Sequence, residues 1–160
     1  MMINMVDISE KDIVERIAIA EGKIYLKKET VNKILKKEIK KGDVLTVAEI
    51  SAINAVKKTT NLILLCHQIP IANVDVNFKI NEKENSITAN VKVKAIAKTG
   101  VEMEALTGVT VALLTIWDMT KYIEKDKKGQ YKTTKISDIE VIKKKLKKKS
   151  NYSAIPKNYR

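Results

Sequence analysis

The stretch GVEMEALTGVTVALLTIWDMTKYI, residues 100–123, decides the fold because it predicts the longest helix of the chain. At about 100° of rotation per residue, one face collects large apolar side chains, namely Leu106, Val109, Leu113, Ile116 and Trp117. The opposite face carries small and apolar residues with a carboxylate near each end, namely Glu104, Gly108, Val111, Thr115 and Asp118. A helix that is apolar nearly all round is usually buried on both sides. We therefore expect this helix to lie at a subunit interface of a homo-oligomer, where another subunit covers its second side.

The segments just before this helix predict an antiparallel hairpin. Apolar and polar residues alternate over residues 74–79 and again over 87–95, as they do in strands with one buried face. The connection 81–86 is rich in turn-forming residues. It is short enough to join two neighbouring strands.

The first part of the chain predicts one strand and two helices. Residues 13–28 alternate in polarity and indicate the strand. Thr30 is the expected N-cap of the first helix. The second helix is expected over residues 44–59, where Thr46 begins a capping box.

A last strand is expected over residues 136–142, which completes the order strand, helices, two strands, long helix, strand. This order fits an α+β fold, a ferredoxin-like antiparallel sheet with helices packed on it. We expect residues 1–142 to form a single domain and residues 143–160 to form a basic, mobile C-terminal tail.

The formal net charge of +12 raises the alternative of a basic nucleic-acid-binding α+β domain without catalysis. Residues 121–160 hold 14 basic against 4 acidic residues, whereas residues 1–120 hold 17 against 15. The body of the chain is therefore nearly neutral. No pair of aromatic residues lies on a predicted strand in the pattern that stacks bases, so we expect no nucleic-acid partner.

Cysteine content and hydropathy limit the cellular compartments in which we expect the protein. The single Cys66 excludes an internal disulfide and favours a reducing compartment, and one cysteine with one histidine disfavours a classical zinc site. The chain shows no signal-peptide pattern and no run of about 18 apolar residues. We expect a cytoplasmic protein without a metal site and without a membrane partner.

The charged residues of the long helix constrain any site built on it. Glu104 and Asp118 are 14 residues apart, so about 21 Å along the axis. They cannot both reach one small reacting centre from the same chain. Either they serve different parts of a large ligand, or partner chains bring opposite ends together in a composite site. Asp118 and Lys121 are three residues apart and close enough to interact.

Four separated segments carry a pattern known from one enzyme family, in the same order and with similar spacing. They are MVDIS at 5–9, KGDVLTVAEISAINAVKKT at 41–59, LLCH at 64–67, and GVEMEALT…ALLTIWDMTK at 100–121. Together they resemble the cyclic pyranopterin monophosphate synthases. The resemblance implies a ferredoxin-like subunit in a hexamer built of dimers, with active sites between subunits.

The resemblance also implies a reaction, that of a lyase in molybdenum cofactor biosynthesis. The small-molecule substrate is 3′,8-cyclo-7,8-dihydro-GTP, and the product is cyclic pyranopterin monophosphate with release of pyrophosphate. The reaction needs proton transfers on the purine-derived ring and attack of a ribose-derived hydroxyl on the α-phosphate. The resemblance implies general acid/base chemistry without a metal or another cofactor, and it makes the predicted domain 1–142 catalytic.

By the same resemblance three residues are expected to be catalytic. Lys121 occupies the family's essential lysine position, for which we expect general acid/base work. Asp118 is expected to orient Lys121 or to relay its proton, because a neighbouring anion favours the charged form of a lysine. Lys41 occupies the second essential lysine position, with a role in either proton transfer or phosphate stabilisation.

Two further segments are expected to bind the substrate. Leu65, Cys66 and His67 match a pocket segment of the family, with His67 contacting the base or a phosphate. Cys66 is expected to be a packed residue and not a nucleophile. Met103 and Glu104 match a substrate-binding pair, in which the carboxylate accepts hydrogen bonds from a guanine-like edge.

The remaining expected site residues lie beside these segments or in the tail. Glu102 is grouped with the substrate-binding residues, and Asp7 and Lys11 are expected to support the site. Lys149 is the expected phosphate-contacting residue of the tail, although the glycine-rich loop usual in the family is replaced here by residues 147–152 without a glycine. Which tail lysine meets the triphosphate stays open.

Overall fold

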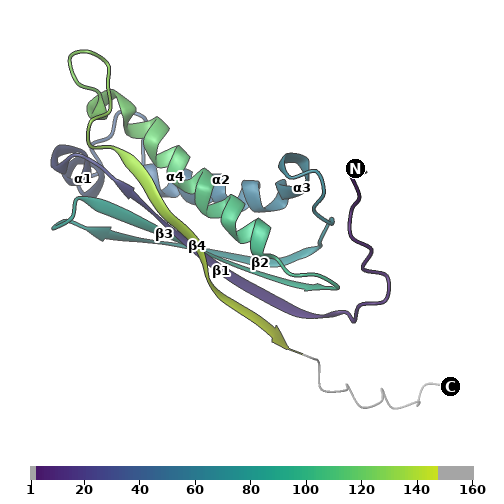
Figure 1. Cartoon of the computed structure of the whole chain (residues 1–160). Coiled ribbons are helices and arrows are strands. Elements are labelled where there is room, and N and C mark those ends of the chain that lie inside the picture. The colour runs from purple at the N-terminus through teal and green to yellow at the C-terminus, as the bar shows by residue number, and fades with distance from the viewer. Residues whose placement is uncertain (1–2, 148–160) are drawn as a thin grey trace.

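Within residues 3–147, which are the residues that the structure describes, four antiparallel strands form one sheet in the order β2-β3-β1-β4 (Figure 1). In this computed structural model the strands are β1 (Val14–Tyr25), β2 (Ile71–Asn81), β3 (Ser86–Ala97) and β4 (Lys135–Lys147). The helices are α1 (Lys28–Leu35), α2 (Val44–Lys57), α3 (Thr59–Leu62) and α4 (Glu102–Glu124). Helical crossovers precede β2 and β4, and a hairpin joins β2 to β3. The predicted ferredoxin-like α+β fold is confirmed.

The helices pack on one face of the sheet (Figure 1). On β3 every second residue is fully buried beneath them, namely Ile87, Ala89, Val91, Val93 and Ala95. The intervening Lys92 and Lys94 point to the other face and keep about two fifths of their side chains exposed. This alternation is the pattern from which the strand was predicted. No helix among residues 3–147 is both long and apolar enough to cross a bilayer.

Gly22 of β1 lets α4 lie close against the centre of the sheet. A Cβ atom at this position would lie 2.7 Å from Cγ1 of Val109 and 2.9 Å from Cδ1 of Leu113, both on α4. Such distances are shorter than carbon atoms tolerate. The strand continues through Gly22 without a break, although its pairing with β4 shifts register beside this residue.

The second side of α4 is covered in part by α2 of the same chain, which corrects the expectation that another subunit covers this side. A Cβ atom at Gly108 would lie 2.9 Å from Cγ2 of Val56 on α2. Glu104 at the start of the same face is also buried. Towards the other end of α4, Leu114 remains 53% exposed. Hydrophobic periodicity indicates that a face is buried but not by which element.

The two predicted N-cap residues are wrong, although α2 begins at Val44 as expected. Thr30 is not an N-cap, because α1 begins at Lys28 and the Thr30 hydroxyl donates to the buried carboxylate of Glu124. The N-cap of α2 is Asp43, whose Oδ1 accepts a hydrogen bond of 3.1 Å from the backbone N–H of Thr46. Aspartate is a stronger N-cap residue than threonine.

Strand β4 extends beyond the expected end of the domain at residue 142. Lys143 pairs with Ile19 of β1, and Lys147 pairs with Glu15. Residues 143–147 are therefore part of the sheet and not of a tail, because backbone pairing with β1 orders even a lysine-rich segment. The expected tail from residue 148 onwards lies outside the described residues, and so does Lys149.

Candidate active site

Lys41, Asp118 and Lys121 form one cluster, which we call the lysine–aspartate cluster. Nζ of Lys41 lies 2.7 Å from Oδ2 of Asp118 and donates a second hydrogen bond of 2.9 Å to the Asp118 carbonyl oxygen. Nζ of Lys121 lies 2.7 Å from Oδ1 of the same carboxylate. The fold thus brings together two amines that are 80 positions apart, with one carboxylate between them.

The cluster's electrostatics favour an ionised carboxylate and a protonated Lys121. Hydrogen bonds from Lys121 and from Lys41 lower the pKa of Asp118 from 3.8 to about 2. The same hydrogen bond to Asp118 raises the pKa of Lys121 above its usual value of 10.5. In this state Lys121 can donate a proton or stabilise negative charge, and it becomes a base only after giving up its proton.

The cluster is assembled by α4 and by the loop before α2. Asp118 and Lys121 lie one turn apart near the C-terminal end of α4. Lys41 belongs to residues 36–43, which we call the Lys41 loop. The next residue, Gly42, has a φ of +106°, a conformation that side chains other than glycine rarely adopt. The Lys41 side chain then reaches back to the carboxylate on α4.

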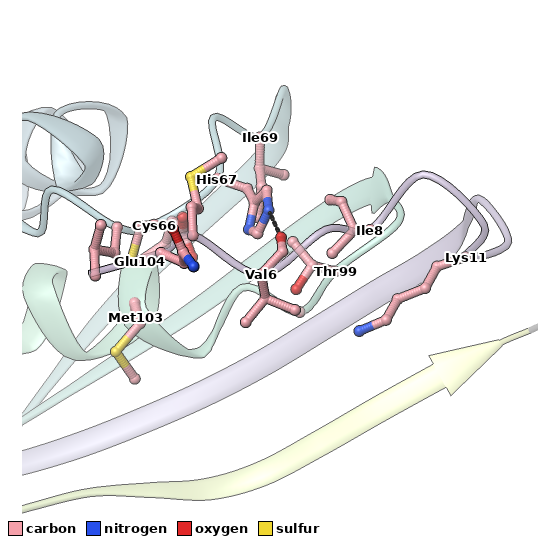
Figure 2. A pocket seen from close by; sticks show the side chains of 13 residues that line it. Val6, Ile8, Lys11, Cys66, His67, Ile69, Thr99, Met103 and Glu104 are labelled. Atoms are coloured by element: carbon pink, nitrogen blue, oxygen red, sulfur yellow. Dashed lines mark hydrogen bonds between the residues drawn. The ribbon is translucent and has the colours of Figure 1, made fainter. Parts of the chain in front are cut away.

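A cavity of about 400 Å³ lies at the opposite end of α4, next to its first turn (Figure 2). Its wall includes five of the residues predicted to bind substrate, namely Leu65, Cys66, His67, Met103 and Glu104. Lys11 also lines it. A cavity of this volume is within the range of ligand sites in proteins.

The N-terminal segment forms part of the cavity wall, through backbone contacts that the sequence did not reveal. Nε2 of His67 lies 2.7 Å from the carbonyl oxygen of Val6, and Figure 2 shows this hydrogen bond beside Cys66 and Glu104. Lys98 holds the same segment through a hydrogen bond of 2.6 Å from Nζ to the carbonyl oxygen of Ser9. His67 uses Nε2 for this contact within the chain, so a ligand would meet the ring through Nδ1.

Burial tunes two groups of the cavity wall. Glu104 is only 3% exposed, and this burial raises its pKa above the usual 4.5. Burial, followed by the nearby charge of Glu104, raises the pKa of the Cys66 thiol above 9.0. A thiol in that state is a poor nucleophile near neutral pH. Glu104 is the group of the wall best suited to exchange hydrogen bonds or a proton with a ligand.

Glu104→Gln is expected to raise the melting temperature at pH 7 and to change it little at pH 4. Because the pKa of Glu104 is raised on folding, wild-type stability falls as the pH rises from about 4.5 through the raised value. Glutamine carries no charge and escapes this loss. Thermal unfolding followed by circular dichroism between pH 4 and 8 measures the difference, with the exposed Glu49→Gln as control. A variant that is less stable than wild type at pH 7 would contradict the prediction.

Two expected site residues are not part of either group. The carboxylate of Glu102 contacts Nζ of Lys144 on β4 and folds over Gly100, and Glu102 does not line the cavity. The backbone N–H of Ser9 and its hydroxyl both donate to Asp7, which stabilises the turn of the N-terminal segment and lowers the pKa of Asp7.

The cavity and the lysine–aspartate cluster lie at opposite ends of one helix. Glu104 belongs to the cavity and Asp118 to the cluster, and the 14 residues between them span about 21 Å along α4. One small reacting centre cannot touch both groups within a single chain. The fold and the two groups of residues define an α+β protein with an acid–base cluster and a separate ligand-sized cavity.

Comparison with known proteins gives the family. Residues 5–146 match the MoaC family. The chain is 59% identical to a Methanococcoides burtonii protein named probable cyclic pyranopterin monophosphate synthase, over 88% of this chain and 87% of that protein. It is 55% identical to a Pyrococcus abyssi protein of the same name, and 55% identical to a Methanothermobacter thermautotrophicus protein named probable cyclic pyranopterin monophosphate synthase accessory protein; both alignments cover 89% of this chain and 88% of the relative. The chain belongs to the MoaC family.

Proposed function

We propose that this protein is a cyclic pyranopterin monophosphate synthase of molybdenum cofactor biosynthesis. It converts 3′,8-cyclo-7,8-dihydro-GTP to cyclic pyranopterin monophosphate and releases pyrophosphate. The observation that carries the proposal is the cluster in which Asp118 joins Lys41 and Lys121, the two residues that the family resemblance makes essential. The names of the relatives support the same pathway.

The cluster suits the chemistry that this lyase reaction requires. A ribose-derived hydroxyl loses its proton and forms a bond to the α-phosphorus, while the bond to the bridging oxygen breaks and pyrophosphate leaves with the electron pair. Lys121, held protonated by Asp118, donates a proton during the rearrangement. Lys41 stabilises the negative charge of the phosphates. In this proposal side chains alone perform the acid–base work, and no step passes through a metal.

The cavity supplies recognition of the substrate. Glu104 accepts hydrogen bonds from the guanine-like edge of the ring system, and Met103 packs against its face. The free Nδ1 of His67 contacts the base or a phosphate. Glu102 and Lys149 remain candidates for substrate contact. Glu102 is the first residue of α4, at the helix end next to the cavity.

The separation of the two groups supports a composite site made by two chains. We propose a homo-oligomer, a hexamer built of dimers, in which the cluster of one subunit faces the cavity of its partner. The partly exposed apolar residues of α4, among them Leu114, belong to that interface in this proposal. The reaction takes place in the cytoplasm, in agreement with a chain that has a single cysteine.

The alternative of a basic nucleic-acid-binding domain is not favoured. Four of the lysines that produce the C-terminal charge excess, residues 143–145 and 147, lie in strand β4 and not in a free arm. Lys41 and Lys121 are paired with the carboxylate of Asp118, which offsets part of their positive charge. The relatives are named for pterin synthesis and not for nucleic-acid binding.

The proposal is tested by supplying 3′,8-cyclo-7,8-dihydro-GTP to the purified chain alone. We expect cyclic pyranopterin monophosphate and pyrophosphate to appear in equal amounts, measured by chromatography and by a coupled phosphate assay. Because one relative is named an accessory protein, no other protein is added. Substrate that is bound but not converted by the pure chain would contradict the proposed enzyme function.

A further inference from the structure

Tyr122 connects the C-terminal end of α4 to the Lys41 loop. Its phenol oxygen accepts a hydrogen bond of 3.0 Å from the backbone N–H of Lys40. Nζ of Lys40 lies 5.8 Å from the centre of the same ring. The phenol therefore contacts Lys40, the residue directly before Lys41. Tyr122 itself directly follows Lys121 in the chain. None of the roles described above uses it.

The Lys41 loop depends on such contacts because it is not part of a helix or strand. Ile39 is buried, and the N–H of Gly42 donates a hydrogen bond of 3.0 Å to its carbonyl oxygen. An ion pair of 3.2 Å between Lys37 and Asp43 joins the two ends of the loop, but none of these contacts ties Lys40 or Lys41 to α4. The Lys41 ammonium sits at the end of a flexible four-carbon side chain. Its two hydrogen bonds to Asp118 form together only while the backbone at position 41 stays within reach of that end of α4.

The end of α4 that carries Tyr122 is itself firmly held. Glu124, two residues on, is fully buried, and its carboxylate accepts hydrogen bonds from the hydroxyls of Thr30 and Thr134 and from the backbone N–H of Lys27. The Lys27 ammonium donates a hydrogen bond of 2.8 Å to the carbonyl oxygen of Ile123. These contacts tie α4 to α1 and to the segment before β4. The backbone that carries Tyr122 is consequently well held, and its side chain, which is 40% exposed, lies over the loop at Lys40.

We propose that Tyr122 is a positioning residue for Lys41. Its hydroxyl sets the backbone at Lys40, and this places the Lys41 ammonium on Asp118 beside Lys121. Tyr122 acts through Lys41 and does not touch the substrate. The inference about catalysis rests on the proposed function, whereas the placement of Lys41 can be measured without it. Small displacements of a catalytic group lower a rate strongly because the reacting geometry is lost.

The first test is Tyr122→Phe, which keeps the ring and removes the acceptor for the Lys40 N–H. Reductive methylation of the lysines for short times, followed by mass spectrometry of peptides, reports how readily each lysine side chain reacts through its free amine. We expect Lys41 to react several times faster in the variant, because its pairing with Asp118 is weakened. Lys121 keeps its own partner and should react as in wild type. Tyr25→Phe, at a tyrosine that lies against Lys23 and Lys135, is the matched control.

The second test is turnover of the cyclised dihydro-GTP by the same variants. Tyr122→Phe is expected to lower kcat about tenfold with KM changed by less than about twofold, since the cavity residues that bind the ring system stay in place. In a Lys41→Arg background the further loss caused by Tyr122→Phe should shrink, because the group that the phenol positions has already been replaced. Tyr25→Phe should behave like wild type.

The outcomes separate this inference from the proposed function. Unchanged methylation of Lys41 in Tyr122→Phe would overturn the positioning role, whatever the turnover. Faster methylation of Lys41 together with an unchanged kcat would overturn its importance for catalysis. If wild type itself shows no turnover while Lys41 methylation responds to Tyr122→Phe, the proposed function fails and the placement of Lys41 by Tyr122 stands.

Discussion

Replacement of Lys121 by alanine is expected to lower kcat for cyclic pterin formation by at least about a hundredfold, the usual minimum for loss of a positioned proton donor. The variant lacks the ammonium that Asp118 holds protonated, so neither a proton nor a compensating charge is present where the rearrangement needs it. Fold and assembly should be preserved because the Lys121 side chain is 44% exposed. Steady-state turnover measures the loss, and light scattering measures the oligomer.

Two further variants make this result specific. Lys127→Ala removes an exposed lysine from the loop after α4 and should turn over at the wild-type rate. Lys121→Arg keeps the positive charge, but a guanidinium does not release its proton near neutral pH. Recovery of most of the rate by arginine would reassign Lys121 to charge stabilisation. A normal rate in Lys121→Ala would remove it from the mechanism altogether.

Mixed oligomers of two inactive variants are expected to regain about a quarter of the wild-type activity, provided that each variant damages a different group. Lys121→Ala destroys the lysine–aspartate cluster and keeps the cavity, whereas Glu104→Ala does the reverse. In a randomly mixed two-fold dimer half of the dimers contain one chain of each kind, and one of their two sites is then intact. Refolding the two variants together and measuring turnover gives the recovered fraction.

The matched control is a mixture of Lys41→Ala and Lys121→Ala. Both lysines contact the same Asp118 carboxylate within one chain, so no mixed site contains both intact amines. This mixture should remain as inactive as its parents. Recovery in this mixture would show that the lysines of one site come from different chains. Failure of the mixture with Glu104→Ala would contradict the composite site.

The sequence predicted the main elements because their periodicity is strong. The long helix was expected almost at its observed bounds, and the hairpin was expected in place although β2 is longer at both ends than the predicted residues 74–79. The partner of α4 could not be predicted in the same way. Gly108 is packed against Val56, which lies 52 positions away on α2. The periodic pattern of one helix does not indicate which distant segment packs against it.

The lysine-rich end of β4 shows a different limit. Lys143 and Lys147 were expected in a tail because charge dominates the local composition. In the structure they belong to a strand at the edge of the sheet, where one side of the backbone pairs with β1 and the long side chains remain in water. Edge strands tolerate lysine, so charge alone does not separate them from a free segment.

The candidate site could be predicted only where it consists of side chains that match the family. Lys41 and Lys121 meet at Asp118, while the catalytic roles expected of the three residues stay predictions. The hydrogen bond from His67 to the Val6 carbonyl could not be foreseen, because every residue has a carbonyl oxygen and the sequence does not mark which one is used. The contact between Tyr122 and the Lys40 N–H was hidden for the same reason.

The lysines of β4 also limit how copies of this protein can associate. Two such strands meeting edge to edge in antiparallel fashion would bring several ammonium groups into one narrow band, and like charges at strand-pairing distance repel. The addition of one copy after another through the β4 edge, which is how fibres grow, is therefore disfavoured. Self-association is left to other surfaces, where a rotation can close the assembly at a fixed number of copies.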